Sequence, residues 1–470
     1  MTTDFDRALL AILGERGIVP DSDAETHCID WRGIHRGQAR AVIRPSTTQE
    51  VSQVVALCAA HGVPIVPQGG NTGLAGGAIP SARGDEIVLL TGRMNRILEA
   101  SPADATLIVQ AGVTLAAARE AAAEMGLMFP LSIGSEGSAQ IGGILSTNAG
   151  GSGTARYGNA RDLALGLEVV LPDGQVWNGL RKLRKDNSGY CLRHLVMGAE
   201  GSLGIITAAV LKLVPAPQAI ATAFCSVDTV QAALTLQQSL KKLSGTELHT
   251  FEYMSRAGLE MVLRHIPNTR LPVILADHHI LVEFTSTSAE NGESELEQGL
   301  THMLDQGVIS DAAIASSETA RRDFWRLRES FAEAQLREGA HIKCDVSVPV
   351  SRVSDFIDAV SSACASAFPG SSIVSLSHLG DGNVHCNVHC PKNGDPVAFL
   401  AGGNAVTALV DDIVAAFDGS FSAEHGIGGA KVNEMETRKE AAELRLMRLI
   451  KNSFDPARIM NPGKVLKGTY

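Results

Sequence analysis

Apolar positions along the chain repeat with two periods, which predict alternating helices and strands. Near the start, the pattern predicts a helix from Phe5 to Leu13 and an amphipathic helix over residues 48–61. Strands are predicted over residues 41–45, 64–67, 165–171, 205–214, 220–227 and 281–284. Further helices are predicted over residues 229–243, 289–306 and 319–338. The Pro215-Ala-Pro217 segment lies between two such groups of elements, so we expect a domain boundary there.

Residues 377–389 predict a β-hairpin. Asp381-Gly382 is a strong signal for a two-residue type I′ turn, because that turn needs positive φ at both central positions. This register places His378 opposite His385, with their Cβ atoms roughly 5 Å apart. Two imidazoles that close can bind one metal ion. Taken alone, the hairpin is also compatible with exposed histidines that bind nothing.

Three glycine-rich segments interrupt the first half of the chain, over residues 68–77, 133–158 and 186–204. Glycine lets backbone N–H groups converge on one point, and such nests bind phosphate. The chain has no Walker motif, and no G-x-G-x-x-G follows a strand, so a nicotinamide cofactor in a Rossmann fold is disfavoured. Three separate glycine loops favour a long ligand such as a dinucleotide.

Charged side chains in the second half are candidates for a site around the hairpin. Four residues of the predicted helix over 319–338 fall on one stripe: Arg321, Trp325, Arg328 and Ala332. In the strand that follows, Lys343 and Asp345 share a face. Each of these charges is ordinarily a solvated surface charge unless it converges on the hairpin.

Glu424 is a third potential ligand. Residues 421–424 are predicted to be a short strand, and the glycines that follow permit Glu424 and His425 to serve one site. Together with His378 and His385, Glu424 would form a His₂Glu site. Such a site suits zinc or another borderline divalent metal with open positions.

Composition and charge narrow the class of protein. A chain of 470 residues is expected to form two or three domains. Its 40 basic and 51 acidic residues give a net charge of −11, which argues against nucleic acid as a partner. Eight scattered cysteines without a CxxC pair, a polar N-terminus and no long apolar run predict a reduced, cytoplasmic protein that does not span a membrane.

The glycine segments resemble a known cofactor domain. The strings PQGGNTGLAGG, GGILSTNAGGSGTARYGNARDLALGLEVVLPDG, DNSGY and MGAEGSLGIIT are similar to the FAD-binding domain of the vanillyl-alcohol-oxidase/para-cresol-methylhydroxylase (PCMH) superfamily, over about residues 38–216. By this resemblance the FAD-binding residues are Pro67, Gly69, Gly70, Asn71, Thr72, Gly73, Gly76, Gly77, Ser132, Gly137, Ser138, Gly142, Gly143, Asn148, Gly151, Ile206 and Asn461. Some members attach FAD through a histidine. The loop here has Asn71 and no histidine, so we expect noncovalent FAD.

The later motifs extend the resemblance over nearly the whole chain. WRLRE, IKCD, SHLGDGNVHCN, AEHGIG and NPGK resemble the FAD-dependent D-2-hydroxyacid dehydrogenases, which include D-2-hydroxyglutarate and D-lactate dehydrogenases and the glycolate oxidase flavin subunit. The resemblance implies that His378, His385 and Glu424 bind a divalent metal, expected to be zinc. It also implies that His425 is the catalytic base and touches the substrate, and that Arg328, Lys343 and Asn387 bind substrate carboxylates.

The resemblance predicts an α+β architecture, made of a two-part PCMH-type FAD-binding domain and an α+β substrate (cap) domain with a largely antiparallel sheet. We expect an N-terminal helix and connector over residues 1–37, the FAD domain over 38–216, the substrate domain with the metal site over 217–425, and a helical segment over 426–470 that packs on the FAD domain. The expected reaction oxidises D-2-hydroxyglutarate to 2-oxoglutarate by hydride transfer to FAD.

Several alternatives stay open from the sequence. Ala332 stands where D-2-hydroxyglutarate enzymes often carry a hydroxyl group, so D-lactate or another D-2-hydroxyacid is an alternative substrate. The expected electron acceptor is external, an electron-transfer flavoprotein or a quinone, and the expected assembly is a homodimer. A metal-dependent hydrolase and a noncatalytic flavin subunit are more distant alternatives.

Overall fold

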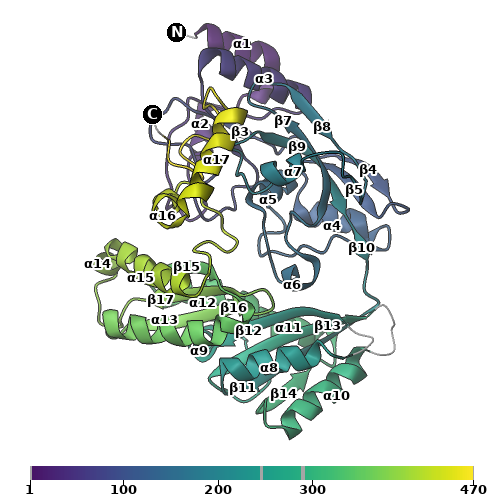
Figure 1. The fold of residues 1–470 in the computed structure, drawn as a ribbon, viewed down its shortest axis with the longest axis vertical. Helices are drawn as coiled ribbons and strands as arrows, with labels where there is room; N and C mark the ends of the chain where they lie inside the picture. Colours follow the sequence, from purple (N-terminus) through teal and green to yellow (C-terminus); the bar gives the residue numbers. More distant parts are fainter. Residues whose placement is uncertain (1–2, 244–246, 287–291, 469–470) are drawn as a thin grey trace. The chain divides into compact units, whose positions relative to one another are not determined.

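The computed structural model describes residues 3–243, 247–286 and 292–468, which form two compact units (Figure 1). Unit 1 contains the described residues up to Gly150, the segment Tyr157–Pro215 and the described residues from His425 on. Unit 2 contains Gly151–Arg156 and Ala216–Glu424. The chain therefore leaves unit 1 and returns to it. The domain boundaries expected from the sequence remain predictions.

Unit 1 begins with a small parallel sheet of order β1-β3-β2. Its elements are α1 (Asp4–Leu13), α2 (Asp21–Ala24), β1 (Ala41–Ile43), α3 (Thr48–His61), β2 (Ile65–Gln68) and β3 (Ile87–Leu90). The α3 helix has the bounds that the sequence predicts, because the Thr47 hydroxyl accepts a bond from the Glu50 N–H at its start and Gly62 adopts φ 64° at its end. Apolar residues of α1 and α3 pack on this sheet.

A five-stranded antiparallel sheet of order β4-β5-β9-β7-β8 forms the second part of unit 1. Its elements are β4 (Ile97–Ser101), β5 (Thr106–Gln110), α4 (Leu115–Ala123), β6 (Leu127–Met128), α5 (Ile141–Thr147), β7 (Ala164–Val170), β8 (Val176–Gly179), α7 (Leu192–Val196), β9 (Ile205–Lys212) and β10 (Val214–Pro215). The short helix α6 (Thr154–Tyr157) begins in the Gly151–Arg156 segment of unit 2. The C-terminal helices are α16 (Val432–Arg438) and α17 (Ala441–Phe454). After α17, the Ile459 carbonyl accepts a bond from the Ile65 N–H, which joins the end of the chain to β2.

Unit 2 is built on a seven-stranded antiparallel sheet of order β14-β11-β13-β12-β16-β17-β15. The strands are β11 (Ala219–Val227), β12 (Glu247–Ser255), β13 (His278–Ser286), β14 (Asp311–Ile314), β15 (His341–Ser347), β16 (Ser372–His378) and β17 (Asn383–His389). The helices are α8 (Val230–Leu240), α9 (Arg256–His265), α10 (Gly292–Asp305), α11 (Glu318–Glu329), α12 (Phe331–Glu338), α13 (Val353–Ala367), α14 (Pro396–Ala401) and α15 (Gly403–Ala416). The antiparallel α+β prediction for this half of the chain is confirmed.

Helices cover both faces of the unit 2 sheet because successive strand residues point to opposite sides. One apolar core joins α8, α10, α13 and α15 to inward residues such as Cys225 and Val282. The other joins α9, α11 and α12 to residues such as Phe224 and Leu281. Charged residues also occur on this second face, at the positions that form the site described below.

Two predicted elements differ in the structure, and part of a third cannot be compared. The helix predicted over residues 319–338 is divided at Ser330 into α11 and α12, and Phe331 of α12 packs where Gly258 of α9 leaves room for its ring. The strand predicted over residues 421–424 is not formed, and only Ser420 makes an isolated bridge, to Ser347 of β15. The predicted start of α10 at residues 289–291 lies outside the described residues.

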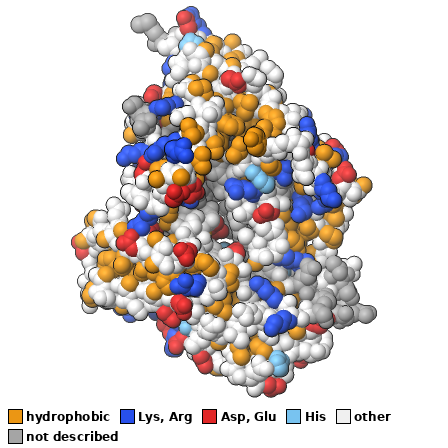
Figure 2. Space-filling view, in the orientation of Figure 1, with side chains coloured by type: hydrophobic (Ala, Val, Ile, Leu, Met, Phe, Trp, Pro, Cys, Tyr) orange, Lys and Arg blue, Asp and Glu red, His pale blue; other side chains and the backbone are white. Residues whose placement is uncertain are grey.

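The face of the molecule drawn in Figure 2 carries Lys and Arg side chains in several separate groups, with Asp and Glu side chains among them. The charge on that face is therefore mixed rather than of one sign. No helix in the described part of the chain is both long and apolar enough to span a bilayer.

Candidate active site

The hairpin forms, but its register differs from the predicted one. His378 of β16 pairs with Asn383 of β17, and His385 pairs with Leu376. A four-residue turn over residues 379–382 replaces the predicted type I′ turn, and within it only Gly382 has positive φ, at 85°. The two histidines still share one face, because the register differs by two residues, which is one full period of a strand. Their ring centroids lie 5.7 Å apart.

Neighbouring strands determine this register. In the turn, Leu379 is fully buried and its N–H donates to the Phe251 carbonyl of β12 at 3.1 Å. The Gly382 carbonyl accepts a bond from the Val348 N–H, which follows β15. A Cβ atom on Gly382 would lie 2.1 Å from the Val348 carbonyl oxygen, so glycine is required there by close packing as well as by φ.

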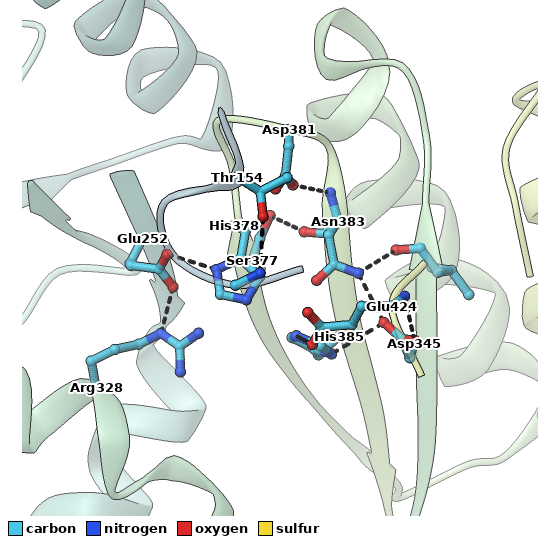
Figure 3. A network of polar contacts seen from close by, with 12 residues as sticks. Thr154, Glu252, Arg328, Asp345, Ser377, His378, Asp381, Asn383, His385 and Glu424 are labelled. Atoms are coloured by element: carbon cyan, nitrogen blue, oxygen red, sulfur yellow. Dashed lines mark hydrogen bonds and ion pairs between the residues drawn. The ribbon is translucent and has the colours of Figure 1, made fainter. Parts of the chain in front are cut away.

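A cluster of possible metal ligands lies at one end of β15 and β17 (Figure 3). Asp345 pairs directly with His385 across these strands. The His385 Nε2 atom lies 3.6 Å from Glu424 Oε1, and its Nδ1 atom lies 3.6 Å from Asp345 Oδ1. One ligand atom from each of these residues, and one from the adjacent His425, lie within 4.8 Å of one another. Imidazole and carboxylate groups at this separation fit a divalent metal ion.

Asp345 is part of the cluster, and sequence reasoning assigned it no function. Its Oδ1 atom accepts a bond from Asn383 Nδ2 at 2.8 Å, and its Oδ2 atom accepts one from the Glu424 N–H at 3.1 Å. Both oxygens therefore hold neighbouring parts of the site in place. We interpret Asp345 as a group that orients His385 and Glu424, although its position also permits direct coordination.

His378 lies outside the 4.8 Å cluster, with its ring beside that of His385. Its Nδ1 atom lies 2.7 Å from Glu252 Oε1. Because a carboxylate only accepts hydrogen bonds, the Nδ1 atom carries a proton and Nε2 is the atom that can act as a ligand. The structure thus brings His385 and Glu424 together. The predicted ligand set of His378, His385 and Glu424 remains a prediction.

Glu252 was missed by sequence reasoning, and Figure 3 shows it between Arg328 and His378 at one side of the polar network. It is 1% exposed and pairs directly with His378 across β12 and β16. Its Oε2 atom accepts a bond from Arg328 Nε at 2.7 Å. The signal in the sequence was a single glutamate among the apolar residues Phe251, Tyr253 and Met254. The structure shows these neighbours to be buried, and an unpaired charge among buried residues is very costly.

Burial and ion pairing shift the pKa values of these groups. Burial disfavours the charged form of Glu252, but His378 and Arg328 outweigh it and lower the pKa of Glu252 to about 2. For His378, burial is likewise outweighed by Glu252, which raises the pKa of His378 to about 9. Burial raises the pKa of Glu424 to about 7. A bound cation would favour ionised Glu424 and would compete with the proton on His378.

Two of the predicted substrate residues, Lys343 and Asn387, lie on the same face of the sheet as the Asp345–His385 pair, and a third, Arg328, lies on α11. Lys343 of β15 is paired with Asn387 of β17, two positions along from the Asp345–His385 pair. The Asn387 side chain donates to Gln335 Oε1 of α12 at 2.8 Å. Arg328 of α11 is largely buried, and its bond to Glu252 uses Nε and not the terminal amino groups.

The position of Ala332 corrects one sequence prediction. The stripe predicted from Arg321 to Ala332 holds for the first three residues: Arg321 and Trp325 both contact Glu283, and Arg328 contacts Glu252. Ala332, however, follows the break at Ser330, belongs to α12 and is exposed. It therefore does not continue the stripe of Arg328.

In unit 1, some of the predicted FAD-binding residues contact one another although they come from distant segments. A Cβ atom on Gly70 would lie 1.9 Å from the Ser138 carbonyl oxygen, so the first two glycine segments are in close contact. The Asn461 side chain donates to the Gly77 carbonyl at 3.0 Å. Asn71 has φ 52°, a conformation that helps to turn successive N–H groups toward one point.

This arrangement fits a cofactor with a pyrophosphate group. Next to the closely packed glycines, a Cβ atom on Gly73, Gly137 or Gly143 would meet no atom within 4 Å, so the backbone there borders open space. Backbone beside open space can approach a ligand closely. Gly151, another predicted contact in the second segment, belongs to unit 2.

Two glycines of the first loop give a matched test of this packing. We expect Gly70→Ala to lower the stability of the FAD-free protein by about 1–3 kcal/mol or more, because the new methyl group meets backbone atoms that cannot move aside. Gly73→Ala meets no protein atom and should leave that stability near wild type. Thermal unfolding of the FAD-free proteins measures both. Equal stability for the two variants would contradict the close contact of the two segments.

Comparison with known proteins agrees with both halves of the chain. Residues 39–179 match the family model described as FAD binding domain, and residues 216–465 match FAD linked oxidases, C-terminal domain. The chain is 36% identical to a mitochondrial D-2-hydroxyglutarate dehydrogenase of Arabidopsis thaliana, over 97% of this chain and 80% of that protein. It is 35% identical to a D-2-hydroxyglutarate dehydrogenase of Xanthomonas citri pv. viticola, over 95% of this chain and 93% of that protein.

More distant relatives bear on substrate and fold. A putative mitochondrial D-lactate dehydrogenase of Schizosaccharomyces pombe is 33% identical, over 97% of this chain and 88% of that protein. Among solved structures, alkyldihydroxyacetonephosphate synthase superposes with a TM-score of 0.73 at 19% identity, covering 99% of this chain and 86% of that one. For p-cresol methylhydroxylase the TM-score is 0.71 at 15% identity, and the superposition covers 97% of this chain and 95% of that one. These structures confirm the predicted PCMH-type fold.

The expected cytoplasmic location is wrong by this comparison. Relatives from Arabidopsis thaliana, Bos taurus and Danio rerio that match nearly the whole chain are all named as mitochondrial enzymes. Composition and cysteine pattern were a poor guide, because a reduced interior is not confined to the cytoplasm.

The expected enzyme class, in contrast, is confirmed, and the hydrolase alternative has no support among these matches. Both domain models concern FAD, and together they account for most of the chain. The full-length relatives named above are dehydrogenases of 2-hydroxyacids. The chain belongs to the FAD-linked oxidase family, as an FAD-dependent hydroxyacid dehydrogenase.

Proposed function

We propose that this protein oxidises a D-2-hydroxyacid, in the first place D-2-hydroxyglutarate to 2-oxoglutarate, with the help of a bound divalent metal, zinc. The observation that carries the proposal is the juxtaposition of His385, Glu424 and Asp345 with the Glu252-bound pair of His378 and Arg328. The imidazole and carboxylate groups suit a metal, and the guanidinium group of Arg328 presents a cation to a substrate carboxylate. The similarity to curated D-2-hydroxyglutarate dehydrogenases supports the choice of substrate.

The residues divide between holding the metal and holding the substrate. His378, His385 and Glu424 would bind the metal, with Asp345 orienting the last two. A metal at such a site acts as a Lewis acid toward substrate oxygens. Noncovalent FAD would occupy the glycine loops of unit 1 and supplies the hydride-accepting chemistry.

The substrate residues supply opposite charge and a base. Arg328 can hold a carboxylate through two parallel N–H groups, and Lys343 adds a second positive charge. Asn387 offers an amide to the same ligand. His425 takes the proton of the C2 hydroxyl group as the C2 hydrogen leaves with its electron pair and the C2–O bond becomes a carbonyl. An external protein or quinone then accepts the electrons, and we propose a homodimer as the assembly.

D-lactate is the second candidate substrate. Ala332 lacks a hydroxyl group and is exposed on α12, so it offers no hydrogen bond to a distal carboxylate. The Schizosaccharomyces pombe relative is named a putative D-lactate dehydrogenase. If distal recognition is weak, the enzyme should discriminate little between D-lactate and D-2-hydroxyglutarate.

Anaerobic flavin bleaching tests the proposal directly. Purified protein should be yellow, release FAD on denaturation, and be bleached by D-2-hydroxyglutarate but not by its L enantiomer. D-lactate in the same series decides between the two candidate substrates. A protein without flavin absorbance, or one that no D-2-hydroxyacid reduces, would contradict the proposed reaction.

Metal removal tests the other half of the proposal. Prolonged treatment with a strong chelator should remove about one metal ion per chain and lower turnover to background, and Zn²⁺ should restore it. Elemental analysis before and after treatment provides the measurement. Full activity in a protein shown to be free of metal would rule out a catalytic metal while leaving the flavin reaction intact.

A further inference from the structure

Glu252 contacts two groups with different proposed tasks. Its Oε1 atom accepts from His378 Nδ1 at 2.7 Å, and its Oε2 atom accepts from Arg328 Nε at 2.7 Å (Figure 3). His378 belongs to the hairpin and Arg328 to α11, so one carboxylate joins two separate elements. At 1% exposure Glu252 is shielded from water, and both bonds are charge-assisted.

We propose that Glu252 is a positioning residue that holds the metal-binding imidazole of His378 and the substrate-binding guanidinium of Arg328 in one fixed geometry. The inference rests on the proposed function, because it assigns Glu252 to the same site. A carboxylate on the second nitrogen of a metal-binding histidine fixes its tautomer and raises its basicity as a ligand. Glu252 adds a fixed orientation for Arg328, since its bond to Nε restrains the plane of the guanidinium group.

The backbone favours this double contact. Glu252 and His378 are directly paired residues of β12 and β16, so their side chains leave the sheet on the same side. Arg328 reaches them from α11, where Phe324 and Leu327 are buried in the core beneath that helix. The sheet fixes Glu252 and His378, and the packed helix fixes Arg328. Glu252 therefore contacts both partners from regular secondary structure and not from a flexible loop.

Replacement of the carboxylate by an amide should disturb both partners. In Glu252→Gln the side chain has one acceptor oxygen and one NH₂ group. One of its two partners, Arg328 Nε–H or His378 Nδ1–H, would therefore face the NH₂ group, which is itself a donor. If the NH₂ group faces Arg328, the guanidinium group must turn away. If it faces His378, the imidazole must accept at Nδ1, which places its proton on Nε2 and blocks the ligand atom.

The chain offers a matched control in Glu283. This glutamate is 2% exposed, lies on the same face of the sheet, and accepts from Arg321 Nε at 2.7 Å and Trp325 Nε1 at 2.8 Å, both on α11. Glu283→Gln therefore removes an equally buried charge bonded to the same helix. It touches neither His378 nor Arg328.

The experiment compares full-length, FAD-loaded wild type with Glu252→Gln and Glu283→Gln. Competition between the protein and a chelator for Zn²⁺ should show metal binding weakened about 10- to 100-fold in Glu252→Gln and unchanged in Glu283→Gln. KM for the hydroxyacid should rise in Glu252→Gln alone. Thermal unfolding of both variants separates these effects from a general loss of stability, and Glu252→Asp, which keeps the charge, should lie between Glu252→Gln and wild type.

The outcomes distinguish this inference from the proposed function. Wild-type metal affinity and KM in Glu252→Gln would overturn the positioning role. Equal losses in the two glutamine variants would also overturn it, because the effect would then come from the fold. If wild type binds no metal, the proposed metal dependence and the His378 part of the inference both fail, and KM alone still decides the Arg328 part.

Discussion

His425→Ala should reduce flavin reduction by substrate about 10²- to 10⁴-fold while FAD remains bound, because the variant loses the proposed acceptor of the hydroxyl proton. Without a base, the hydroxyl proton is held more tightly as the C2 hydrogen leaves, so the barrier to hydride transfer rises. Stopped-flow bleaching at saturating substrate measures this step directly. The flavin spectrum of the resting enzyme reports whether FAD is retained.

A histidine away from the site provides the control for this variant. His61, at the end of α3, is exposed and packs its ring against Phe5. His61→Ala should therefore keep wild-type bleaching. The pH dependence adds a second readout, since the acid limb of kcat/KM that comes from protonation of the base should disappear with His425. Near-normal bleaching by His425→Ala, or an unchanged acid limb, would exclude His425 as the base.

The elements with local signals could be predicted from the sequence. The α3 helix has a capping threonine at one end and glycine at the other, and its predicted and observed bounds agree. The hairpin was also located correctly, because Asp381-Gly382 is a local turn signal. Its register was wrong because Asp381-Gly382 is only one of the constraints on the turn. The bond from Leu379 to β12 and the close packing of Gly382 after β15 come from strands far along the chain.

The site was predictable only in part, and distance along the chain explains the difference. His385 and Glu424 carry recognisable motifs, and the structure brings them together. Glu252 lies 126 residues before His378, and Asp345 lies 79 residues before Glu424. Glu252 has no neighbour in sequence that suggests a role, and Asp345, although it lies in the IKCD string, was assigned none. Only the order of strands in the sheet places β12 beside β16 and β15 beside β17.

This strand order also shows which histidines of the hairpin can serve a metal. On β17, His385 faces Asp345 and Glu424, whereas His389, four residues on, stacks against His341 at a centroid distance of 4.8 Å. Burial lowers the pKa of His389 to about 4, and its Nε2 atom lies 3.2 Å from Gln335 Oε1. His389 is thus a neutral core residue on the same strand face, which makes it a suitable control for His385.

We expect His385→Ala to abolish metal binding and lower turnover by at least about 10²-fold, because it removes an imidazole whose two nitrogen atoms lie 3.6 Å from Glu424 and from Asp345. FAD, bound by the glycine loops of unit 1, should remain. His389→Ala should keep its metal, although the cavity it leaves should cost stability. Elemental analysis, flavin absorbance and turnover of the two variants provide the measurement. A metal content in His385→Ala equal to that of His389→Ala would place the metal elsewhere and leave the cluster with a purely structural function.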